Sequence, residues 1–501
     1  MKLSDLLADI GPYSLAGSAG IDVACVAYSS RQMPPGGLFV AVRGLSTDGH
    51  RYAGEAVERG AVAVVCEQPL PGLRATQVIV PDSRVALGRL ACAFYGHPAR
   101  SLKLVGITGT NGKTTTSYLA ESVLTAAGHR VGVIGTVNYR YAGRSFPAQQ
   151  TTPESLDLQR LLREMLEAGI THVVMEVSSH ALDLRRADGC PFDVAVFTNL
   201  SRDHLDYHRT MEAYFAAKRR LLSELLSTNA CKGPGCAVIN LADPCGQRLC
   251  EIGCRRYGFG PPGADIHALE AEAGLSGIRA VLATPAGRLQ VRSPLLGRHN
   301  LENIMAATGV GLALGVAPEA IARGIEGLAA VPGRFQPVPN HAGIHVLIDY
   351  AHTDDALRHA LGSLRGLNPA RLTCVFGCGG DRDRGKRPLM GRAVAELADL
   401  AVVTSDNPRT EDPEAIIADI LPGLAGLKRL EPGECRGRRG YTVVVDRAQA
   451  IELAITQAAP GEVILIAGKG HEDYQIVGRE KRHFDDAEVA ARVLRSLGAT
   501  S

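Results

Sequence analysis

The sharpest chemical signal in the sequence is a glycine-rich loop, GITGTNGKTTT, at residues 106–116. It follows the apolar run LVGI and precedes a helix-like segment. Backbone amides of such a loop, with the positive end of the following helix, can hold phosphate groups. The strict motif would place glycine at position 107, whereas this chain has Gly106, so the loop is a variant. An ordinary glycine turn rarely combines these features, and we therefore predict nucleotide binding. The predicted contacts are Gly109, Thr110, Asn111, Gly112, Lys113, Thr114 and Thr115.

Magnesium ligands are predicted at two further strand ends and within the loop itself. A hydroxyl of Thr114 or Thr115 can bind the ion. Glu176 ends the apolar run VVMEV, and a carboxylate at that edge of a parallel sheet can also reach it. His204 lies in SRDHLDYH, whose carboxylates and imidazoles can hold a second magnesium ion. The alternatives are a helix-capping turn at Glu176 and a solvated polar loop at His204.

The segment DNPR, at residues 406–409, follows the apolar run LAVVTS and has the chemistry of an amino-acid site. Asp406 and Asn407 can receive an ammonium group, and Pro408 stiffens the loop. Arg409 offers a planar fork for a carboxylate. A ligand that carries both groups is an amino acid. The alternative, with nearly equal weight for this segment alone, is a plain turn.

The elements that position these residues form three predicted domains of α/β class. Residues 1–98 read as a small mixed α/β domain, because short apolar runs are separated by Gly and Pro. Residues 99–330 alternate short apolar runs with amphipathic helices, which predicts a doubly wound parallel sheet. The alternation restarts after the linker-like VPGR, so residues 331–501 form a second, Rossmann-like α/β domain.

Composition excludes several other classes of protein. The 54 basic and 52 acidic residues leave a formal charge of only +2, aromatic residues make up 5%, and there is no Trp, so nucleic acid is not an expected partner. The first residues and the rest of the chain lack an uninterrupted apolar run of signal-peptide or membrane-span length, so we expect a cytoplasmic protein without membrane insertion. The spacing of Cys231, Cys236, Cys245, Cys250 and Cys254 matches no zinc site, and reduced thiols are expected.

These segments also resemble a known family. In chain order they are GTNGKTT, MEVSSH, TNLSRDHLDYH, the helical AAK, LGRHNLENIMAA, DYAHT, GCGGDRDRGKRPLM, DNPR and AGKGHEDYQ, and together they resemble the Mur ligase family. Within that family the resemblance is to members that add meso-diaminopimelate to UDP-N-acetylmuramoyl-L-alanyl-D-glutamate with ATP and Mg²⁺. It implies a UDP-binding N-terminal domain, a central ATPase domain and a C-terminal amino-acid domain, which we expect to act as a monomer.

The resemblance also assigns roles to individual residues. Lys113, Lys218 and His204 are implied to be catalytic, with Lys218 carbamylated to N6-carboxylysine so that its added carboxylate helps to hold a second metal ion. Glu176 and His204 correspond to metal ligands. Further nucleotide contacts are implied at Asn300, Asn303, Arg334, Asp349 and His352. Contacts to the UDP-linked peptide are implied at Ser30, Thr151, Thr152, Ser178 and Arg186. Contacts to diaminopimelate are implied at Arg382, Asp406, Asn407, Pro408, Arg409, Gly468 and Glu472.

Two departures and three rival functions accompany the resemblance. Leu184 stands where relatives often have Gln, which weakens one substrate contact, and Asp354 stands where Pro is usual. A folylpolyglutamate synthetase would share the phosphate loop but not DNPR or GKGHEDYQ. A ligase that adds L-lysine would lack Arg409, because lysine has no second carboxylate to pair with it. A regulatory nucleotide switch would need no amino-acid site at all.

Overall fold

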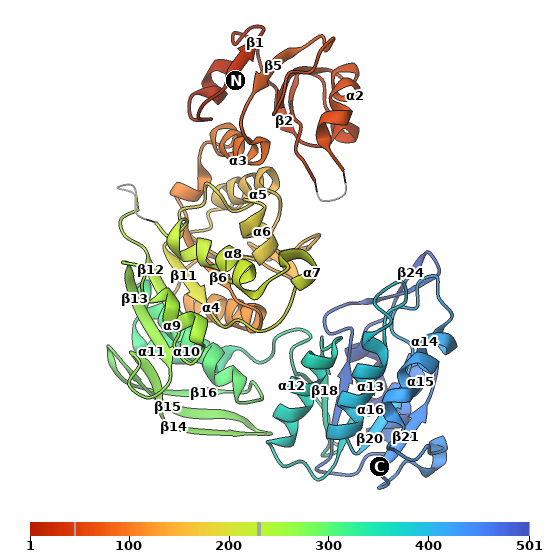
Figure 1. Ribbon diagram of the computed structural model, residues 1–501. Coiled ribbons are helices and arrows are strands. Elements are labelled where there is room, and N and C mark those ends of the chain that lie inside the picture. The colour runs from red at the N-terminus through yellow and green to blue at the C-terminus, as the bar shows by residue number, and fades with distance from the viewer. Residues whose placement is uncertain (45–46, 228–231, 500–501) are drawn as a thin grey trace. The chain divides into compact units, whose positions relative to one another are not determined.

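The computed structural model describes residues 1–44, 47–227 and 232–499. These residues form two compact units, coloured from red to blue along the chain in Figure 1. The first unit comprises Met1–Leu269, Val281–Gln290 and Glu302–Ile325. The second comprises Glu270–Ala280, Val291–Leu301 and Glu326–Ser501. Both contain parallel sheets covered by helices, so the predicted α/β class is confirmed.

The N-terminal part of the first unit contains a five-stranded sheet with the order β1-β5-β4-β3-β2. Its strands are β1 Ser14–Ala16, β2 Cys25–Ala27, β3 Gly37–Val40, β4 Ala61–Cys66 and β5 Thr76–Ile79, of which only β1 runs antiparallel to its neighbour. The helices are α1 Leu3–Leu7, α2 Ala53–Glu58 and α3 Ser83–Phe94. Helix α3 begins where the Asp82 carboxylate accepts the backbone N–H groups of Arg84 and Val85.

The central sheet positions the phosphate loop. Its order is β16-β15-β14-β13-β12-β11-β6-β10-β7-β8-β9, and the segment from β13 to β7 is parallel. Strands β6, β10 and β11 are almost wholly buried, as expected for parallel strands covered on both faces. The strands are β6 Lys103–Thr108, β7 Val131–Ile134, β8 Asn138–Tyr141, β9 Arg144–Pro147, β10 His172–Glu176, β11 Val194–Phe197, β12 Cys236–Asn240, β13 Arg255–Gly260, β14 Ile266–Gly274, β15 Gly277–Thr284 and β16 Gly287–Ser293.

The helices around this sheet begin beside the predicted site residues. The phosphate loop runs directly from β6 into α4, which begins at Lys113. The helices are α4 Lys113–Ala126, α5 Ser155–Glu167, α6 Ser179–Asp183, α7 Leu205–His208, α8 Met211–Ser223, α9 Pro244–Leu249, α10 His299–Ala313 and α11 Pro318–Gly327. Helix α10 spans the boundary between the two units.

The second unit contains a doubly wound sheet with the order β17-β18-β22-β19-β20-β21. Only β17 is antiparallel to its neighbour. The strands are β17 Gln336–Val338, β18 His345–Asp349, β19 Leu372–Phe376, β20 Leu400–Val403, β21 Gly440–Val443 and β22 Val463–Ala467. The helices are α12 Asp354–Arg365, α13 Lys386–Leu397, α14 Pro413–Ile420, α15 Arg447–Thr456 and α16 Asp486–Ala499, and a hairpin is formed by β23 Tyr474–Val477 and β24 Glu480–His483.

Two apolar clusters lie on the two faces of this second sheet. One joins Leu465 and Cys374 to residues of α12, α13 and α14, and the other joins Ile464 and Val375 to residues of α15 and α16. Alternate residues of one strand thus point to opposite clusters, as the strand geometry requires. Because the strands are parallel, the loops that follow β18, β19, β20 and β22 meet at one edge of the sheet, where ligands of such folds bind.

The cysteines that the structure describes are free thiols, as predicted. Cys231, part of the cluster considered above, lies outside the described residues. No helix within residues 1–44, 47–227 and 232–499 is both long enough and apolar enough to cross a membrane.

Candidate functional site

The phosphate loop has a backbone that only glycine adopts easily at two positions. Gly109 has φ +148° and Gly112 has φ +84°. A Cβ atom at Gly109 would lie 1.9 Å from the Thr198 hydroxyl, and one at Gly112 would lie 2.4 Å from the Asn303 side-chain oxygen. Conformation and close packing therefore both require glycine at these two positions.

The segment after β11 braces the phosphate loop from one side. The side-chain oxygen of Asn199 accepts the N–H of Asn111 at 2.9 Å, and the Thr198 hydroxyl donates to the Asn111 carbonyl at 2.6 Å. The N–H of Ser201 donates to the Thr110 hydroxyl at 3.0 Å. The TNLS segment thus fixes the loop before any ligand is bound.

Lys113 lies over the loop that it follows in the sequence. Its Nζ donates to the carbonyls of Gly109 at 2.9 Å and Thr110 at 2.8 Å. An ammonium group at this position is available to the outer phosphates of a nucleotide cradled by the loop.

Glu176 and Thr114 meet as the sequence predicts. The Thr114 hydroxyl donates to one Glu176 carboxylate oxygen at 3.0 Å, and Thr136 donates to both oxygens, through its hydroxyl at 2.9 Å and its N–H at 3.1 Å. Thr115 is buried in the same first turn of α4. A hydroxyl and a carboxylate beside a phosphate site are suitable donors for Mg²⁺, which keeps several water ligands and binds phosphate oxygens. The residues present therefore fit that ion.

Lys218, on α8, is brought to the same loop. Its side chain is 1% exposed, and its Nζ donates to the Gly109 carbonyl at 2.7 Å and lies 4.6 Å from the centre of the Tyr214 ring. Burial holds the pKa of Lys218 well below its usual value, and the charge of Lys113 lowers it further. A lowered pKa favours the neutral amine of lysine, which is its nucleophilic form.

His204 lies near these two lysines. Its ring contacts that of His180, with centroids 4.9 Å apart, and its Nε2 is 3.5 Å from the Asp203 carboxylate. Burial lowers the pKa of His204, Asp203 opposes this shift, and the charges of Lys113 and Lys218 reinforce it. Among the described residues, no group of three or more His, Cys, Asp or Glu side chains could hold a metal ion. A magnesium ion at this loop would therefore take several of its ligands from hydroxyls and phosphate oxygens beside Glu176 and His204.

The residues expected to contact the UDP-linked peptide cluster beyond β10. Thr151 shares a hydrogen bond with Thr136 at 3.1 Å. The Thr152 hydroxyl donates to the Glu176 carbonyl at 2.9 Å and accepts the N–H of Ser178 at 3.1 Å. Arg186 pairs with Glu154 at 2.9 Å and donates to the Thr152 carbonyl at 3.4 Å. Leu184 lies at the end of α6, two residues before Arg186.

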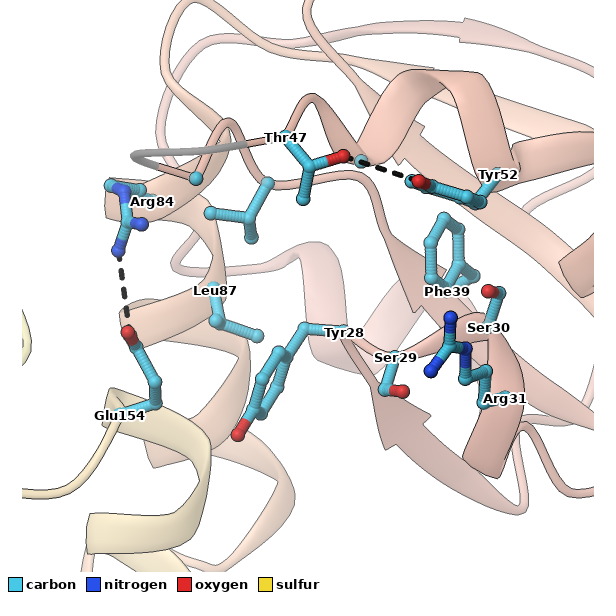
Figure 2. A pocket seen from close by; sticks show the side chains of 13 residues that line it. Tyr28, Ser29, Ser30, Arg31, Phe39, Thr47, Tyr52, Arg84, Leu87 and Glu154 are labelled. Atoms are coloured by element: carbon cyan, nitrogen blue, oxygen red, sulfur yellow. Dashed lines mark hydrogen bonds and ion pairs between the residues drawn. The ribbon is translucent and has the colours of Figure 1, made fainter. Parts of the chain in front are cut away.

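Ser30 lines a cavity of about 390 Å³ in the N-terminal part of the first unit. Ser29, Ser30 and Arg31 lie along one side of it, opposite Arg84 and Glu154 (Figure 2). The Ser30 hydroxyl donates to the Glu55 carboxylate at 3.0 Å, and Arg84 is 3.4 Å from Glu154.

Of the remaining predicted nucleotide contacts, only Asn303 lies in the same unit as the phosphate loop. Its side-chain oxygen accepts a hydrogen bond from the Thr116 hydroxyl at 3.2 Å and is the same atom that would meet a Cβ atom at Gly112. The other four belong to the second unit. Asn300 donates to the Leu296 carbonyl at 2.6 Å, and Asp349 accepts the N–H groups of Phe335 and Ala351. Arg334 lies 5.0 Å from the Tyr350 ring centre, and His352 forms a hydrogen bond with the Tyr350 carbonyl. Burial raises the pKa of Asp349 and lowers that of His352.

The predicted amino-acid contacts come together in the second unit. The loop after β20 interlocks with the loop after β19, because Gly380 donates to the Asn407 carbonyl at 2.9 Å and Arg409 donates to the Gly380 carbonyl at 2.7 Å. A Cβ atom at Gly379 would lie 3.0 Å from the Arg409 guanidinium and 3.8 Å from the Arg382 side chain. Both arginines therefore flank the same glycine.

The loop after β22 supplies the acidic side of this cluster. Glu472 accepts the Asn407 amide at 3.0 Å, and Gly468 lies 3.8 Å from the Asp406 carboxylate, measured from an added Cβ atom. Burial raises the pKa of Glu472, the charge of Asp406 raises it further, and the Asn407 hydrogen bond opposes both. Two carboxylates and the Arg409 guanidinium thus meet at one edge of the sheet, with the stem of Arg382 beside them and Pro408 also buried there.

Comparisons with known proteins agree with this arrangement. Family models match in chain order: the Mur ligase family, catalytic domain, at residues 22–95, the Mur ligase middle domain at 107–311, and the Mur ligase, glutamate ligase domain, at 333–470. A UDP-N-acetylmuramoyl-L-alanyl-D-glutamate–2,6-diaminopimelate ligase of Geobacter metallireducens is 50% identical over 100% of this chain and 99% of its own length. The chain belongs to the Mur ligase family.

Two further proteins with the same printed name are similar to this Mur ligase. One, from Geobacter sulfurreducens, is 47% identical over 99% of each chain. The other is a solved structure with a TM-score of 0.72 at 33% identity, covering 99% of this chain and 100% of that one. The similarity extends along the whole chain, so it includes both the phosphate loop and the DNPR loop.

Some residues of this Mur ligase that shape the two clusters were missed by sequence reasoning. Thr136 orients Glu176, Asn199 braces the phosphate loop, and Lys469 is buried among the amino-acid contacts. The signal for Lys469 was present in the motif AGKGHEDYQ, of which only Gly468 and Glu472 were selected. Asn199 likewise lies in the motif TNLSRDHLDYH, whereas Thr136 lies in none of the quoted motifs, and its role comes from Glu176, which is 40 residues away.

Proposed function

We propose that this Mur ligase uses ATP to join meso-diaminopimelate to the D-glutamate carboxyl group of UDP-N-acetylmuramoyl-L-alanyl-D-glutamate. The observation that carries the proposal is the cluster of Asp406, Asn407, Arg409, Arg382 and Glu472 in a chain that also has a complete phosphate loop. The cluster offers acidic groups for an ammonium and guanidinium groups for a carboxylate. The printed names of relatives that match over their whole length support the same activity.

The chemistry proceeds in two steps in this proposal. A carboxylate oxygen of the peptide attacks the γ-phosphorus of ATP, the bond to the β–γ bridging oxygen breaks, and ADP leaves, which forms an acyl phosphate. The neutral amine of diaminopimelate then attacks the carbonyl carbon, and the tetrahedral intermediate expels inorganic phosphate while the nitrogen loses a proton. Lys113 follows the negative charge onto the transferred phosphoryl group.

The roles of the other residues in the first unit are part of the same proposal. Thr114, Thr115, Glu176, His204 and a carbamylated Lys218 would hold Mg²⁺, which neutralises phosphate charge. The burial and the lowered pKa of Lys218 support carbamylation, because that reaction needs an unprotonated amine to attack carbon dioxide and then release a proton. Thr151, Thr152, Ser178 and Arg186 would hold the peptide, and the cavity beside Ser30 would hold the UDP end.

The second unit would supply the remaining contacts. Asn300, Arg334, Asp349 and His352 are proposed to meet the nucleotide together with Asn303 of the first unit. We also propose that the chain has three domains, with boundaries after residues 98 and 330, and that it acts as a monomer in the cytoplasm.

Dependence of phosphate release on the substrates tests the proposal. In the presence of ATP and magnesium, we expect the purified protein to release inorganic phosphate only when the UDP-linked dipeptide and diaminopimelate are both added. Equal release without the peptide would contradict the ligase and favour a nucleotide switch.

A further inference from the structure

Lys469 is an unusual residue for the interior of a protein, because it is a cation with an exposed fraction of 0%. It is the second residue after β22 and lies between the two predicted contacts of that loop, Gly468 and Glu472. Its Nζ has three oxygen neighbours: it donates hydrogen bonds to the Asn407 side-chain oxygen at 3.0 Å and the Tyr474 carbonyl at 2.7 Å, and it pairs with an Asp406 carboxylate oxygen at 3.3 Å. A lysine ammonium has three donors, so its position is fixed from three directions.

The contact with Asn407 determines which way that amide points. The Asn407 side-chain oxygen accepts two donors, Lys469 Nζ and the N–H of Ile476 at 3.0 Å. Neither donor could face an NH₂ group, so the amide nitrogen must point to the other side, where it donates to Glu472 at 3.0 Å. Lys469 thus acts on Glu472 through Asn407.

The contact with Asp406 compensates a buried negative charge. Asp406 is 8% exposed, and among the described residues the oxygen that faces Lys469 has no partner besides this ion pair at 3.3 Å. Burying a carboxylate without compensation is costly, and a second one nearby, Glu472, increases that cost. Lys469 offsets both negative charges without standing on the solvent side of the cluster.

The contact with Tyr474 ties the hairpin to the same point. Strand β23 begins at Tyr474, and its Ile476 also accepts the N–H of Arg409 at 3.0 Å. Lys469 therefore connects the loop after β20, the loop after β22 and the hairpin, which together carry the acidic groups and Arg409.

We propose that Lys469 is a positioning residue of the amino-acid subsite, which keeps the Asn407 amide turned toward Glu472 and places a positive charge beside Asp406, so that both acidic side chains can receive the ammonium group of the incoming amino acid. The identity of that amino acid rests on the proposed function. Lys469 itself is buried behind the two acidic residues and acts through them.

The test compares Lys469→Met with Lys481→Met. Methionine keeps the length of the side chain and removes its charge and donors. Lys481, on β24, is an exposed lysine of the adjoining hairpin, 3.7 Å from the Tyr474 ring centre, and none of its contacts involves Asp406 or Asn407. We expect Lys469→Met to raise the KM for diaminopimelate at least about tenfold, with the KM values for ATP and the UDP-linked dipeptide within about twofold of the parent. Lys481→Met should match the parent in all three.

A pH profile separates positioning by charge from a general loss of packing. With one cation removed, the acidic limb of kcat/KM for diaminopimelate should move to higher pH in Lys469→Met, because the positive charge of Lys469 lowers the pKa of Glu472. The charged and titratable groups around Lys469 are Asp406, Arg409, Arg447, Glu472, Tyr474 and Asp486. All of them are retained in the variant, so the shift reports the loss of Lys469.

The outcomes are distinct. An active parent with equal KM values and pH profiles in the two methionine variants would overturn this inference alone. A parent that forms no product with diaminopimelate would overturn the proposed function and this inference with it. If Lys469→Met does not fold, Lys469→Gln, which keeps a donor for Asn407 without the charge, is measured in its place. Failure of both to fold would make Lys469 a structural residue and reject the positioning role.

Discussion

Removal of Arg409 should cost this protein its preference for diaminopimelate over lysine. The guanidinium group is partly buried, and one of its donors already binds the Gly380 carbonyl, which leaves the rest of a five-donor fork for the distal carboxylate of a ligand. Lysine lacks that carboxylate. The perturbation Arg409→Ala therefore removes a contact that only one of the two amino acids can make.

The expected magnitude follows from the burial and the backbone at this position. Charge-assisted hydrogen bonds contribute about 1.5–3 kcal/mol, and the partial exposure of Arg409 favours a value of about 2 kcal/mol. That corresponds to roughly a 30-fold rise in the KM for diaminopimelate. Arg409 has φ +52°, but alanine also carries a Cβ atom, so the substitution leaves the backbone strain at this position unchanged.

The assay is saturation with diaminopimelate and with lysine in the parent, in Arg409→Ala and in Arg482→Ala. Arg482 lies on β24, is exposed and pairs with Glu480. The variant Arg482→Ala is therefore a control that also removes one arginine, but away from the proposed ligand. We expect only Arg409→Ala to lose use of diaminopimelate, with lysine use and the KM for ATP changed much less. Equal losses for both amino acids would refute the reasoning and show that Arg409 only shapes the loop.

Further predictions concern the first unit. Lys113→Ala should abolish product formation, since the transferred phosphoryl group loses its cation; near-normal turnover in a folded variant would reject the phosphate-loop assignment. Lys218→Ala should be inactive and partly rescued by a short carboxylic acid, whereas full activity without rescue would exclude a role for a carbamate. Gly112→Ala should raise the KM for ATP at least tenfold through its contact with Asn303, and Gly143→Ala, with a similar φ but open space, should not. Burial lowers the pKa of His172 to about 4, so the unfolded chain binds the extra proton first; the melting temperature should fall as pH drops from 6.5 to 4, and a slope unchanged in His172→Gln would contradict this.

Helices and strands with a clear pattern of apolar residues could be predicted from the sequence. The run LVGI lies in β6, and the first four residues of the run LAVVTS form β20. Strands β14, β15 and β16 were missed, although the burial of β16 alternates between buried and exposed residues. Such half-exposed strands have a weaker signal than fully buried ones, because only every second residue needs to be apolar.

Some residues of the candidate site could be found from local sequence motifs, and others depend on partners that are distant in the chain. The roles of Thr114 and Arg409 follow from motifs that are contiguous in the chain. Lys469 could not be ranked above its neighbours, since its partner Asn407 is 62 residues away and only the parallel order of β20, β19 and β22 brings their loops to one edge.

Mass spectrometry of the reaction product tests the central claim most directly. Purified protein is incubated with ATP, magnesium and the UDP-linked dipeptide, with diaminopimelate in one sample and lysine in another. The account predicts a product whose mass equals the UDP-linked dipeptide plus diaminopimelate minus one water, and little product with lysine. Equal formation of the lysine adduct, or ATP hydrolysis with no adduct in either sample, would contradict it.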